Sequence, residues 1–419
     1  MTKRRFFHVL VLMGVLLAFN AAWVVAQSEI SIVHYYSDAL GKQTMGEILD
    51  GFNAAHPEYK VVDNSAGHED FKTQILVTIA GDNPPDIFSY WAGARTQFIV
   101  DAERLMPLDD FWAESGLDEF IPAGVKTAAI YNGHIYNVPM NVHIVGFFYN
   151  PKVMEAAGIT EMPKTWDEFL TVCETLKASG VTPIALGSRN RWPAQYWFDY
   201  TVSFTAGPEY RQKLMAGEAK YTDPEVETAM GYWKQLVDAG YFVPDANAYD
   251  WDEAANMVAN GEAAMTLMGT WITGLWNSNG LQPVQDYDFF PFPVINPDLP
   301  VVVHGSIDGW TIPQNAKNPE GAKELLKWFM TPEIQQKWAL GQGALAASTA
   351  IDQTAYSPVM AKAAAHLAQV SFLSGYDLST TPPMAEGGLD MFAMFMNDPS
   401  GYKEYLEQTQ AVADDVFGG

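Results

Sequence analysis

Short apolar runs alternate with stretches in which apolar residues recur every three or four positions. Residues 30–36, 61–62 and 86–91 predict three buried strands. Residues 45–52 place apolar side chains at i, i+3, i+4 and i+7, and residues 71–79 also predict a helix. The order strand, helix, strand, helix, strand implies a parallel sheet with right-handed crossovers, so we expect an α/β protein.

Several later helices have recognisable start signals. Residues 165–168 (TWDE) match a capping box. Asp223, Asn318 and Thr331 each precede a proline, so we expect each to cap a helix whose first residue is that proline. The only cysteine, Cys173, falls on the apolar face of the helix that follows Thr165, which predicts a buried and inert thiol.

The first 26 residues have the pattern of an export signal. Basic residues at 3–5 precede a nearly apolar stretch at 6–19, and Ala26 supplies the small residue before cleavage. We assign 1–26 as a signal peptide, with an uncleaved membrane anchor as the alternative. No cysteine lies near the cleavage site and no later run approaches the ~18–20 apolar residues of a membrane span. We therefore expect a periplasmic or otherwise extracytoplasmic protein that is not a lipoprotein.

The charge balance excludes several classes of partner. The chain has 24 basic and 50 acidic residues, a net charge of −26 over 419 residues. Cleavage after Ala26 leaves 21 basic against 50 acidic residues, a net charge of −29. Such a surface repels phosphates, so we expect no nucleic acid partner. A single cysteine forms neither an intramolecular disulfide nor a cysteine-rich zinc site.

Motifs for cofactor or metal chemistry are missing from the sequence. Neither GxGxxG nor GxxxxGK[ST] follows a strand, HExxH does not occur, and the eight histidines show no metal-ligand spacing. Residues 305–309 (GSIDG) only superficially resemble a nucleophile elbow. We expect no cofactor and no metal. A carboxylate pair for glycoside hydrolysis stays an alternative, because some of 50 acidic residues will always be neighbours.

Aromatic and polar side chains gather where strands end. In open α/β sheets, ligands bind beyond the carboxyl ends of the strands. A flat aromatic ring there can stack on the C–H groups of a sugar ring, while a polar neighbour bonds the hydroxyls. Packing in the core is the alternative for each aromatic residue. The residues at these positions are Tyr36, Asp38, Tyr90, Trp91, Trp192, Trp197 and Trp271.

Six segments, in order along the chain, resemble one family. They are residues 52–61 (FNAAHPEYKV), 81–87 (GDNPPDI), 105–109 (LMPLD), 138–150, 263–271 and 310–333. Together they resemble the extracellular solute-binding proteins of the sugar type. The resemblance implies two lobes, each a doubly wound, mostly parallel sheet with flanking helices, joined by a three-stretch hinge. It also implies a carbohydrate ligand delivered to the membrane permease subunits of an ABC importer, and no catalysis. We expect a monomer.

The resemblance also places the crossings between the lobes. By position, we expect them near residues 139–145, 287–293 and 328–334. The expected N-terminal lobe is therefore 27–140 and 291–330, and the expected C-terminal lobe is 141–290 and 331–419.

Within the family, the chain looks most like the glucose-type, hexose-binding branch. That likeness implies sugar contacts from His143 on the crossing strand (beside Asn141), from Trp251 and Trp271, and from Asp308 before a Gly-Trp pair. Two positions depart from the branch. The first strand ends in YYSD (35–38) where the branch tends to have Trp-Trp and then Glu, and Gln342 stands where it tends to have Lys.

A purely structural role is the alternative for several of these residues. Asp308 could cap its own turn, His143 could be a satisfied core histidine, and Trp251 could simply pack. Asp86 is interpreted as structural. Arg189 and Arg191 keep an acidic ligand open, because arginine pairs well with carboxylate. The sequence therefore predicts a protein for a neutral hexose or short oligosaccharide, with an acidic sugar or polyol, a sensor subunit or a secreted glycosidase as alternatives.

Overall fold

The computed structural model describes residues 27–36 and 39–418. The predicted signal peptide and Asp38 lie outside the described residues. A ten-stranded mixed sheet has the central order β2-β1-β3-β10-β6-β8-β7, with β9 and β11 paired to β6 and β12 paired to β10. The strands are β1 (Ser28–Val33), β2 (Tyr59–Asp63), β3 (Ile87–Trp91), β6 (Val138–Tyr149), β7 (Thr182–Ala185), β8 (Ala263–Gly269), β9 (Asp288–Phe290), β10 (Val302–Thr311), β11 (Leu345–Ala346) and β12 (Ser371–Ser374). A separate hairpin joins β4 (Ile130–Tyr131) to β5 (His134–Ile135).

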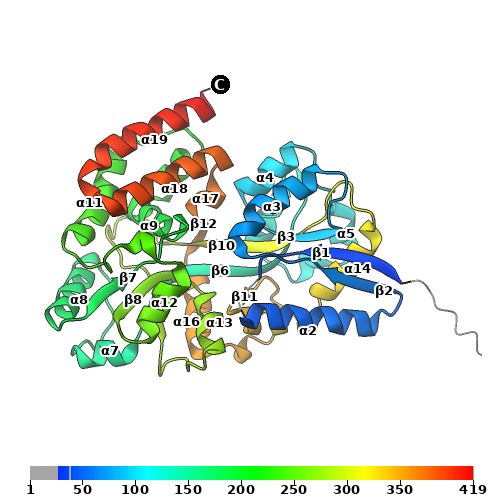
Figure 1. The fold of residues 1–419 in the computed structure, drawn as a ribbon, viewed down its shortest axis with the longest axis horizontal. Helices are drawn as coiled ribbons and strands as arrows, with labels where there is room; N and C mark the ends of the chain where they lie inside the picture. Colours follow the sequence, from blue (N-terminus) through cyan, green and yellow to red (C-terminus); the bar gives the residue numbers. More distant parts are fainter. Residues whose placement is uncertain (1–26, 37–38, 419) are drawn as a thin grey trace, which may run out of the picture.

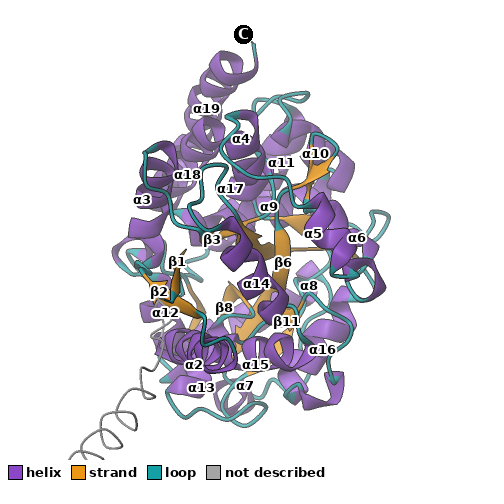
Figure 2. Ribbon diagram, turned by 90° about the vertical axis from the view of Figure 1, so that its right-hand side faces the viewer, coloured by secondary structure: helices purple, strands orange, loops and turns teal. Residues whose placement is uncertain are grey.

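Strand β1 pairs in parallel with both β2 and β3, which confirms the predicted parallel arrangement of the first three strands. Helices cover the sheet, as Figure 2 shows. On the right in Figure 1 lie α2 (Ala39–Ala55), α3 (His68–Ala80), α4 (Ala94–Asp101), α5 (Asp109–Glu114) and α14 (Pro319–Phe329). Two further helices, α6 (Ala123–Thr127) and α15 (Pro332–Gln342), are labelled in Figure 2. The other helices are α7 (Pro151–Ala156), α8 (Trp166–Ala178), α9 (Gln195–Thr205), α10 (Pro208–Met215), α11 (Pro224–Asp238), α12 (Trp251–Ala259), α13 (Ile272–Ser278), α16 (Pro358–Leu367), α17 (Tyr376–Ser379), α18 (Pro382–Asn397) and α19 (Tyr402–Phe417).

Two apolar cores divide the molecule into two lobes. The N-terminal lobe has a core built mainly from residues 30–140 and 310–338. The C-terminal lobe has a core built mainly from residues 142–307 and 345–413. Strands β6 and β10, every residue of which is buried, run from one lobe to the other across the middle of Figure 1.

The crossings differ in part from the expected positions. The change of core in β6 falls within the expected 139–145. The second crossing lies in β10, where Ile307 belongs to the C-terminal core and Trp310 to the N-terminal core. The chain does not cross at 287–293, because β9 pairs with β6 wholly inside the C-terminal lobe. The third lies near β11, since Ile334 and Trp338 of α15 belong to the N-terminal core. Residues 291–307 and 331–342 thus pack in the lobes opposite to those expected.

Two of the predicted helix starts are confirmed. The Thr165 hydroxyl accepts a hydrogen bond from the Glu168 N–H, and the Glu168 carboxylate accepts one from the Thr165 N–H. The Asn318 side chain accepts a hydrogen bond from the Gly321 N–H at the start of α14. Cys173 is fully buried on α8, and burial raises the pKa of its thiol, as expected for an inert residue.

The two other predicted caps are wrong, although helices begin at both prolines. Asp223 bends back to accept hydrogen bonds from the Lys220 N–H (2.9 Å) and the Tyr210 hydroxyl (3.0 Å). The Thr331 hydroxyl donates to the Trp328 carbonyl oxygen (2.9 Å), so it closes the preceding helix rather than opening the next. In both cases a nearby partner competes for the side chain.

Candidate functional site

A cavity of about 570 Å³ lies between the lobes. Its volume is in the range of small-molecule sites. The lining side chains come from the ends of β1 and β3, from α3 and the end of α15, from the hinge strands β6 and β10, and from the C-terminal lobe. The principal lining residues are Tyr35, Tyr36, His68, Glu69, Lys72, Trp91, His143, Asn190, Trp192, Gln195, Tyr196, Trp251, Trp271, Ser306, Asp308, Gln342 and Asp377.

The structure brings eight of the predicted site residues to this cavity. They are Tyr36, Trp91, His143, Trp192, Trp251, Trp271, Asp308 and Gln342. Their contact with a ligand stays a prediction, but the structure shows that they converge on the cavity from eight separate segments.

Tyr90 and Asn141 do not line the cavity. Neighbouring residues of a strand face opposite sides, so Trp91 faces the cavity while Tyr90 is buried in the N-terminal core near Phe71 and Phe88. Trp197 is also a core residue, packed edge-on against Phe147 in the C-terminal lobe.

Asp308 is held in the hinge by a chain of polar contacts. In the pairing of β10 with β6, Asp308 lies opposite Asn141. The Asn141 amide donates to Oδ2 of Asp308 (2.8 Å), and its own oxygen accepts from Nε1 of Trp338 (2.7 Å). Asn141 therefore orients the carboxylate, a supporting role beneath the cavity surface.

His143 faces the same carboxylate but is uncharged. Its Nε2 lies 3.6 Å from Oδ2 of Asp308, and its Nδ1 is 2.8 Å from the Thr270 hydroxyl. Burial lowers the pKa of His143 to about 3. Burial also raises the pKa of Asp308 to about 6, against the opposing hydrogen bond from Asn141. At pH 7 the site thus presents a buried carboxylate beside a neutral imidazole.

Five buried polar atoms of residues that line this cavity make no hydrogen bond to the described part of the chain. They are Oδ1 of Asp308, the hydroxyls of Tyr35 and Tyr36, Oε1 of Gln342 and Nε1 of Trp192. Leaving such a group unsatisfied costs about 1–3 kcal/mol. The Asp308 and Gln342 oxygens only accept hydrogen bonds, the Trp192 Nε1–H only donates, and the two tyrosine hydroxyls do both. A ligand that satisfies them must carry both donors and acceptors, as hydroxyl groups do.

Aromatic rings cover both sides of the cavity. In the N-terminal lobe, Tyr35 stacks on Trp91 with ring centroids 4.4 Å apart. In the C-terminal lobe, Trp271 lies edge-to-face with Trp192 (5.8 Å) and with His143 (5.2 Å). A Cβ on Gly269 would lie 2.0 Å from the Trp271 ring, so the glycine lets this ring lie flat on the strand. The cavity therefore combines apolar faces with polar edges.

Basic side chains near the cavity are paired with acids. Lys72, which lines it, contacts Glu69 at 3.2 Å. Arg189 pairs with Asp250 (2.6 Å), and Arg191 pairs with two acids of α18. Neither arginine is among the lining residues. The lining carboxylates are Glu69, Asp70, Asp250, Asp252, Asp308 and Asp377. This electrostatic environment disfavours an anionic ligand.

Two further properties bear on the kind of site. Within residues 27–36 and 39–418, no group of three or more His, Cys, Asp and Glu side chains is arranged to hold a metal ion. No helix in that part of the chain is long and apolar enough to span a membrane.

Comparison with known proteins now fixes the family. Residues 37–336 match the model of the bacterial extracellular solute-binding proteins. The chain belongs to this family. An ABC transporter extracellular-binding protein of Pyrococcus horikoshii is 31% identical over 380 residues, which cover 88% of this chain and 82% of that one. A probable sugar-binding periplasmic protein of Mesorhizobium japonicum is 26% identical, with 88% and 89% covered.

Solved structures of solute-binding proteins share the fold. One is a bacterial solute receptor described as exclusively preferring β-D-galactopyranose, with a TM-score of 0.86, 25% identity, and 93% of this chain and 100% of that chain covered. Another is a chitin oligosaccharide binding protein, with a TM-score of 0.84, 26% identity, and 94% and 100% covered. The prediction of a two-lobed α/β solute-binding protein is confirmed.

Some cavity residues of this solute-binding protein escaped the sequence analysis. His68 begins α3, just beyond the carboxyl end of β2, so the strand-end rule would have found it. Tyr35 lies next to Tyr36, which was predicted, and both tyrosines after β1 line the cavity. Gln195 and Asp377 are separated by more than 180 residues, and no local pattern marks either of them.

Proposed function

We propose that this solute-binding protein binds a neutral carbohydrate, a hexose or a short oligosaccharide, in the cleft between its lobes. In this account it presents the sugar to the permease subunits of an ABC importer. The observation that carries the proposal is the set of unpartnered buried polar atoms on residues that line one cavity together with aromatic rings. A polyhydroxylated ring matches both the polar edges and the apolar faces.

Roles for individual residues follow from the geometry. Asp308 would accept hydrogen bonds from sugar hydroxyls through its free Oδ1, strengthened by its charge. Trp271 would stack on the sugar ring, and Gln342 would accept a further hydroxyl. Neutral His143 would donate or accept a single hydrogen bond without contributing charge. Asn141 would contribute through the orientation of Asp308.

The relatives support the binding of a carbohydrate and give no support to a catalytic function. Their descriptions include sugar-binding periplasmic proteins and receptors for galactopyranose and chitin oligosaccharides. An acidic sugar is disfavoured because the nearby lysine and arginines are paired with acids. A polyol would match the polar atoms but would not use the aromatic faces as well as a ring does.

A thermal-shift screen followed by calorimetry tests the ligand class. The panel is D-glucose, D-galactose, maltose, diacetylchitobiose, D-glucuronate and sorbitol. A bound sugar at 100 times its Kd stabilises the protein by about 2.7 kcal/mol. We expect at least one neutral sugar to bind, and Asp308→Ala to weaken it about tenfold or more, or 1.4 kcal/mol. The exposed Asp82→Ala serves as the control. Binding of glucuronate alone would overturn the proposal.

Release of sugar from an oligosaccharide at catalytic enzyme levels would instead favour the glycosidase alternative. Import and sensing are separated by uptake of radiolabelled sugar in cells with and without the gene. Loss of uptake supports import, whereas unchanged uptake with a lost transcriptional response supports a sensor.

The state of the exported protein is a further part of the proposal. We propose cleavage after Ala26, no lipid modification and a monomer. Intact mass of the exported protein tests the first two, since cleavage predicts an N-terminal Gln27 and no added lipid mass. Light scattering at micromolar concentration tests the third, and a dimer mass would contradict it.

A further inference from the structure

Two strands from opposite lobes meet on the same edge of the hinge strand β10. Strand β3 pairs antiparallel with residues Asp308 to Thr311, and β12 pairs in parallel with residues Val302 to Gly305. They therefore run toward each other and end about three residues apart along β10. The chain then leaves the sheet into α4 on one side and into α17 on the other. These two helices come into contact beside the hinge.

A buried ion pair joins the two helices. Nε of Arg95, on α4, donates to the backbone oxygen of Asp377, on α17 (3.1 Å), and Nη2 of Arg95 donates to Oδ2 of the same residue (3.2 Å). The side chains are 7% and 8% exposed. The contact is close: Gly93 has a φ of 123°, and a Cβ there would lie 2.2 Å from the Leu378 carbonyl oxygen.

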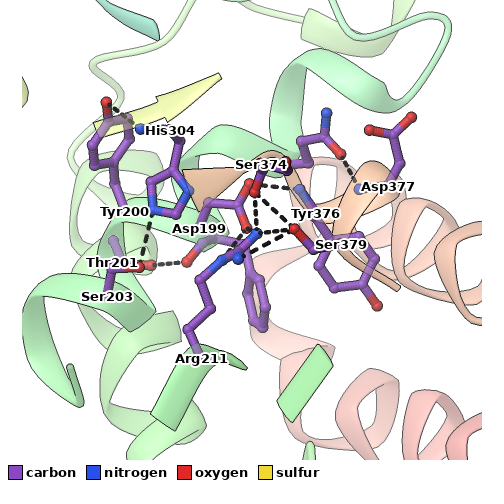
Figure 3. Close-up of polar contacts among 12 residues, drawn as sticks. Asp199, Tyr200, Thr201, Ser203, Arg211, His304, Ser374, Tyr376, Asp377 and Ser379 are labelled. Atoms are coloured by element: carbon purple, nitrogen blue, oxygen red, sulfur yellow. Dashed lines mark hydrogen bonds and ion pairs between the residues drawn. The ribbon is translucent and has the colours of Figure 1, made fainter. Parts of the chain in front are cut away.

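Residues Ser374 to Asp377 are fixed to the C-terminal lobe by a second buried ion pair (Figure 3). Oδ1 of Asp199 accepts from Nε of Arg211 (2.8 Å) and lies 2.7 Å from Nη2, and Oδ2 accepts from the Tyr376 N–H (2.8 Å). Nη2 of Arg211 also donates to the Ser374 carbonyl oxygen (2.8 Å). Arg211 and Asp199 are almost completely buried. This segment therefore moves with the C-terminal lobe.

The same segment forms part of the cleft wall. Asp377 and Leu378 line the cavity, and so does Gln195, whose oxygen accepts from the Asp377 N–H (2.9 Å). Arg95 does not line the cavity. Both of its hydrogen bonds to the wall of the site are to Asp377.

We propose that Arg95 is a positioning residue for ligand binding, and that its pair with Asp377 is a noncovalent fourth crossing between the lobes that holds the cleft closed. The inference rests on the proposed function in that the cleft binds a sugar. Arg95 moves with one lobe and Asp377 with the other, so hinge rotation changes their separation. A contact made only in the closed arrangement shifts the population toward it and slows release of whatever the cleft encloses.

The test compares Arg95→Met with wild type in stopped-flow binding of the neutral panel sugar that wild type binds most tightly. We expect the dissociation rate to rise about tenfold, within the usual range of coupling between sites, and the association rate to change far less. Arg95→Lys keeps the charge and should recover part of the loss. The control is Arg191→Met, which removes ion pairs that lie within the C-terminal lobe and should leave both rates unchanged.

Small-angle scattering without sugar supplies a readout that does not depend on the ligand. Arg95→Met should have a larger radius of gyration than wild type, and Arg191→Met should not. Equal dissociation rates and equal radii for wild type and Arg95→Met would overturn the inference. If Arg95→Met does not fold, Arg95→Lys alone decides between a faster and an unchanged dissociation rate. If wild type binds no panel sugar, the proposed function fails, and the scattering comparison still tests the fourth crossing.

Discussion

The ionisation of Asp308 gives the sharpest consequence of the site geometry. Its carboxylate is buried at the hinge, and burial raises its pKa to about 6. The ionised form accepts charge-strengthened hydrogen bonds at both oxygens, one from Asn141 and one from a sugar hydroxyl, whereas protonation makes one oxygen a donor and a weaker acceptor. Lowering the pH from 8 to 5 therefore converts the site from a form that binds the sugar to one that binds it poorly.

The size of the effect follows from the fraction ionised. At pH 5 about one-tenth of the molecules carry an ionised Asp308, so the apparent Kd should be about tenfold higher than at pH 8. Binding near pH 6 should also release a fraction of a proton, because the sugar favours the carboxylate. His143 stays neutral over this range, since burial lowers its pKa to about 3.

The folding stability of the unbound protein should change with pH in the opposite direction to the sugar affinity. A carboxyl group whose folded pKa is about 6 and whose ordinary value is 3.8 binds its proton more tightly when folded. Its contribution favours the folded state at low pH and is lost as the pH rises from about 4 to 6, with an upper bound of about 3 kcal/mol. Removing the charge should therefore stabilise the unbound protein at pH 7 while weakening sugar binding.

Calorimetry at pH 5, 6, 7 and 8, in two buffers of different ionisation enthalpy, measures both the affinity and the protons released. Asp308→Asn is the matched control, because it keeps the shape and removes the titrating group. Its affinity should be low and flat with pH. Burial also raises the pKa of Asp199 to about 6, and the control separates that group as well. Parallel pH profiles for wild type and Asp308→Asn would refute the reasoning.

Three other variants or treatments test separate parts of the account. Trp271→Ala should raise the sugar Kd about tenfold or more, or 1.4 kcal/mol, and reduce the sugar-induced change in tryptophan fluorescence; retention of both would remove its stacking role. Cys173 should not react with a thiol reagent in the folded protein and should react once per chain in urea, whereas fast native labelling would contradict its burial. Asp86→Ala removes the acceptor for two backbone N–H groups, so urea denaturation should show a loss of about 3 kcal/mol in the free energy of unfolding, with sugar affinity unchanged. The exposed Asp82→Ala should change neither stability nor affinity. A higher sugar Kd in Asp86→Ala would argue against a purely structural role.

Local patterns were sufficient for the first three strands and the helices between them. Periodicity is a property of neighbouring residues, and the parallel pairing of β1 with β2 and β3 follows from the helical crossovers. The same reasoning failed at the second hinge crossing. Residues 288–290 and 302–311 both form buried strands, so burial does not distinguish them. Their pairing does, because β9 pairs with β6 alone whereas β10 pairs with strands of both lobes.

The site was predictable to the extent that strand ends mark it. Trp91 and Trp271 follow that rule, while the choice between Trp91 and Tyr90 depended on which face of β3 meets the cavity. Asp308 lies inside β10, and only the family resemblance pointed to it. Long-range pairing was out of reach. The sequence offered Arg189 as a partner for an acidic ligand, but the fold commits it to Asp250.

The most direct test of the central claim is a crystal structure with the tightest-binding neutral sugar of the panel. The account predicts the sugar in the cleft between the lobes, with one hydroxyl hydrogen-bonded to Oδ1 of Asp308 and the ring stacked on Trp271. It also predicts that hydroxyls satisfy the phenols of Tyr35 and Tyr36 and Oε1 of Gln342. A sugar bound elsewhere, or one in the cleft that leaves Oδ1 of Asp308 without a partner, would contradict it.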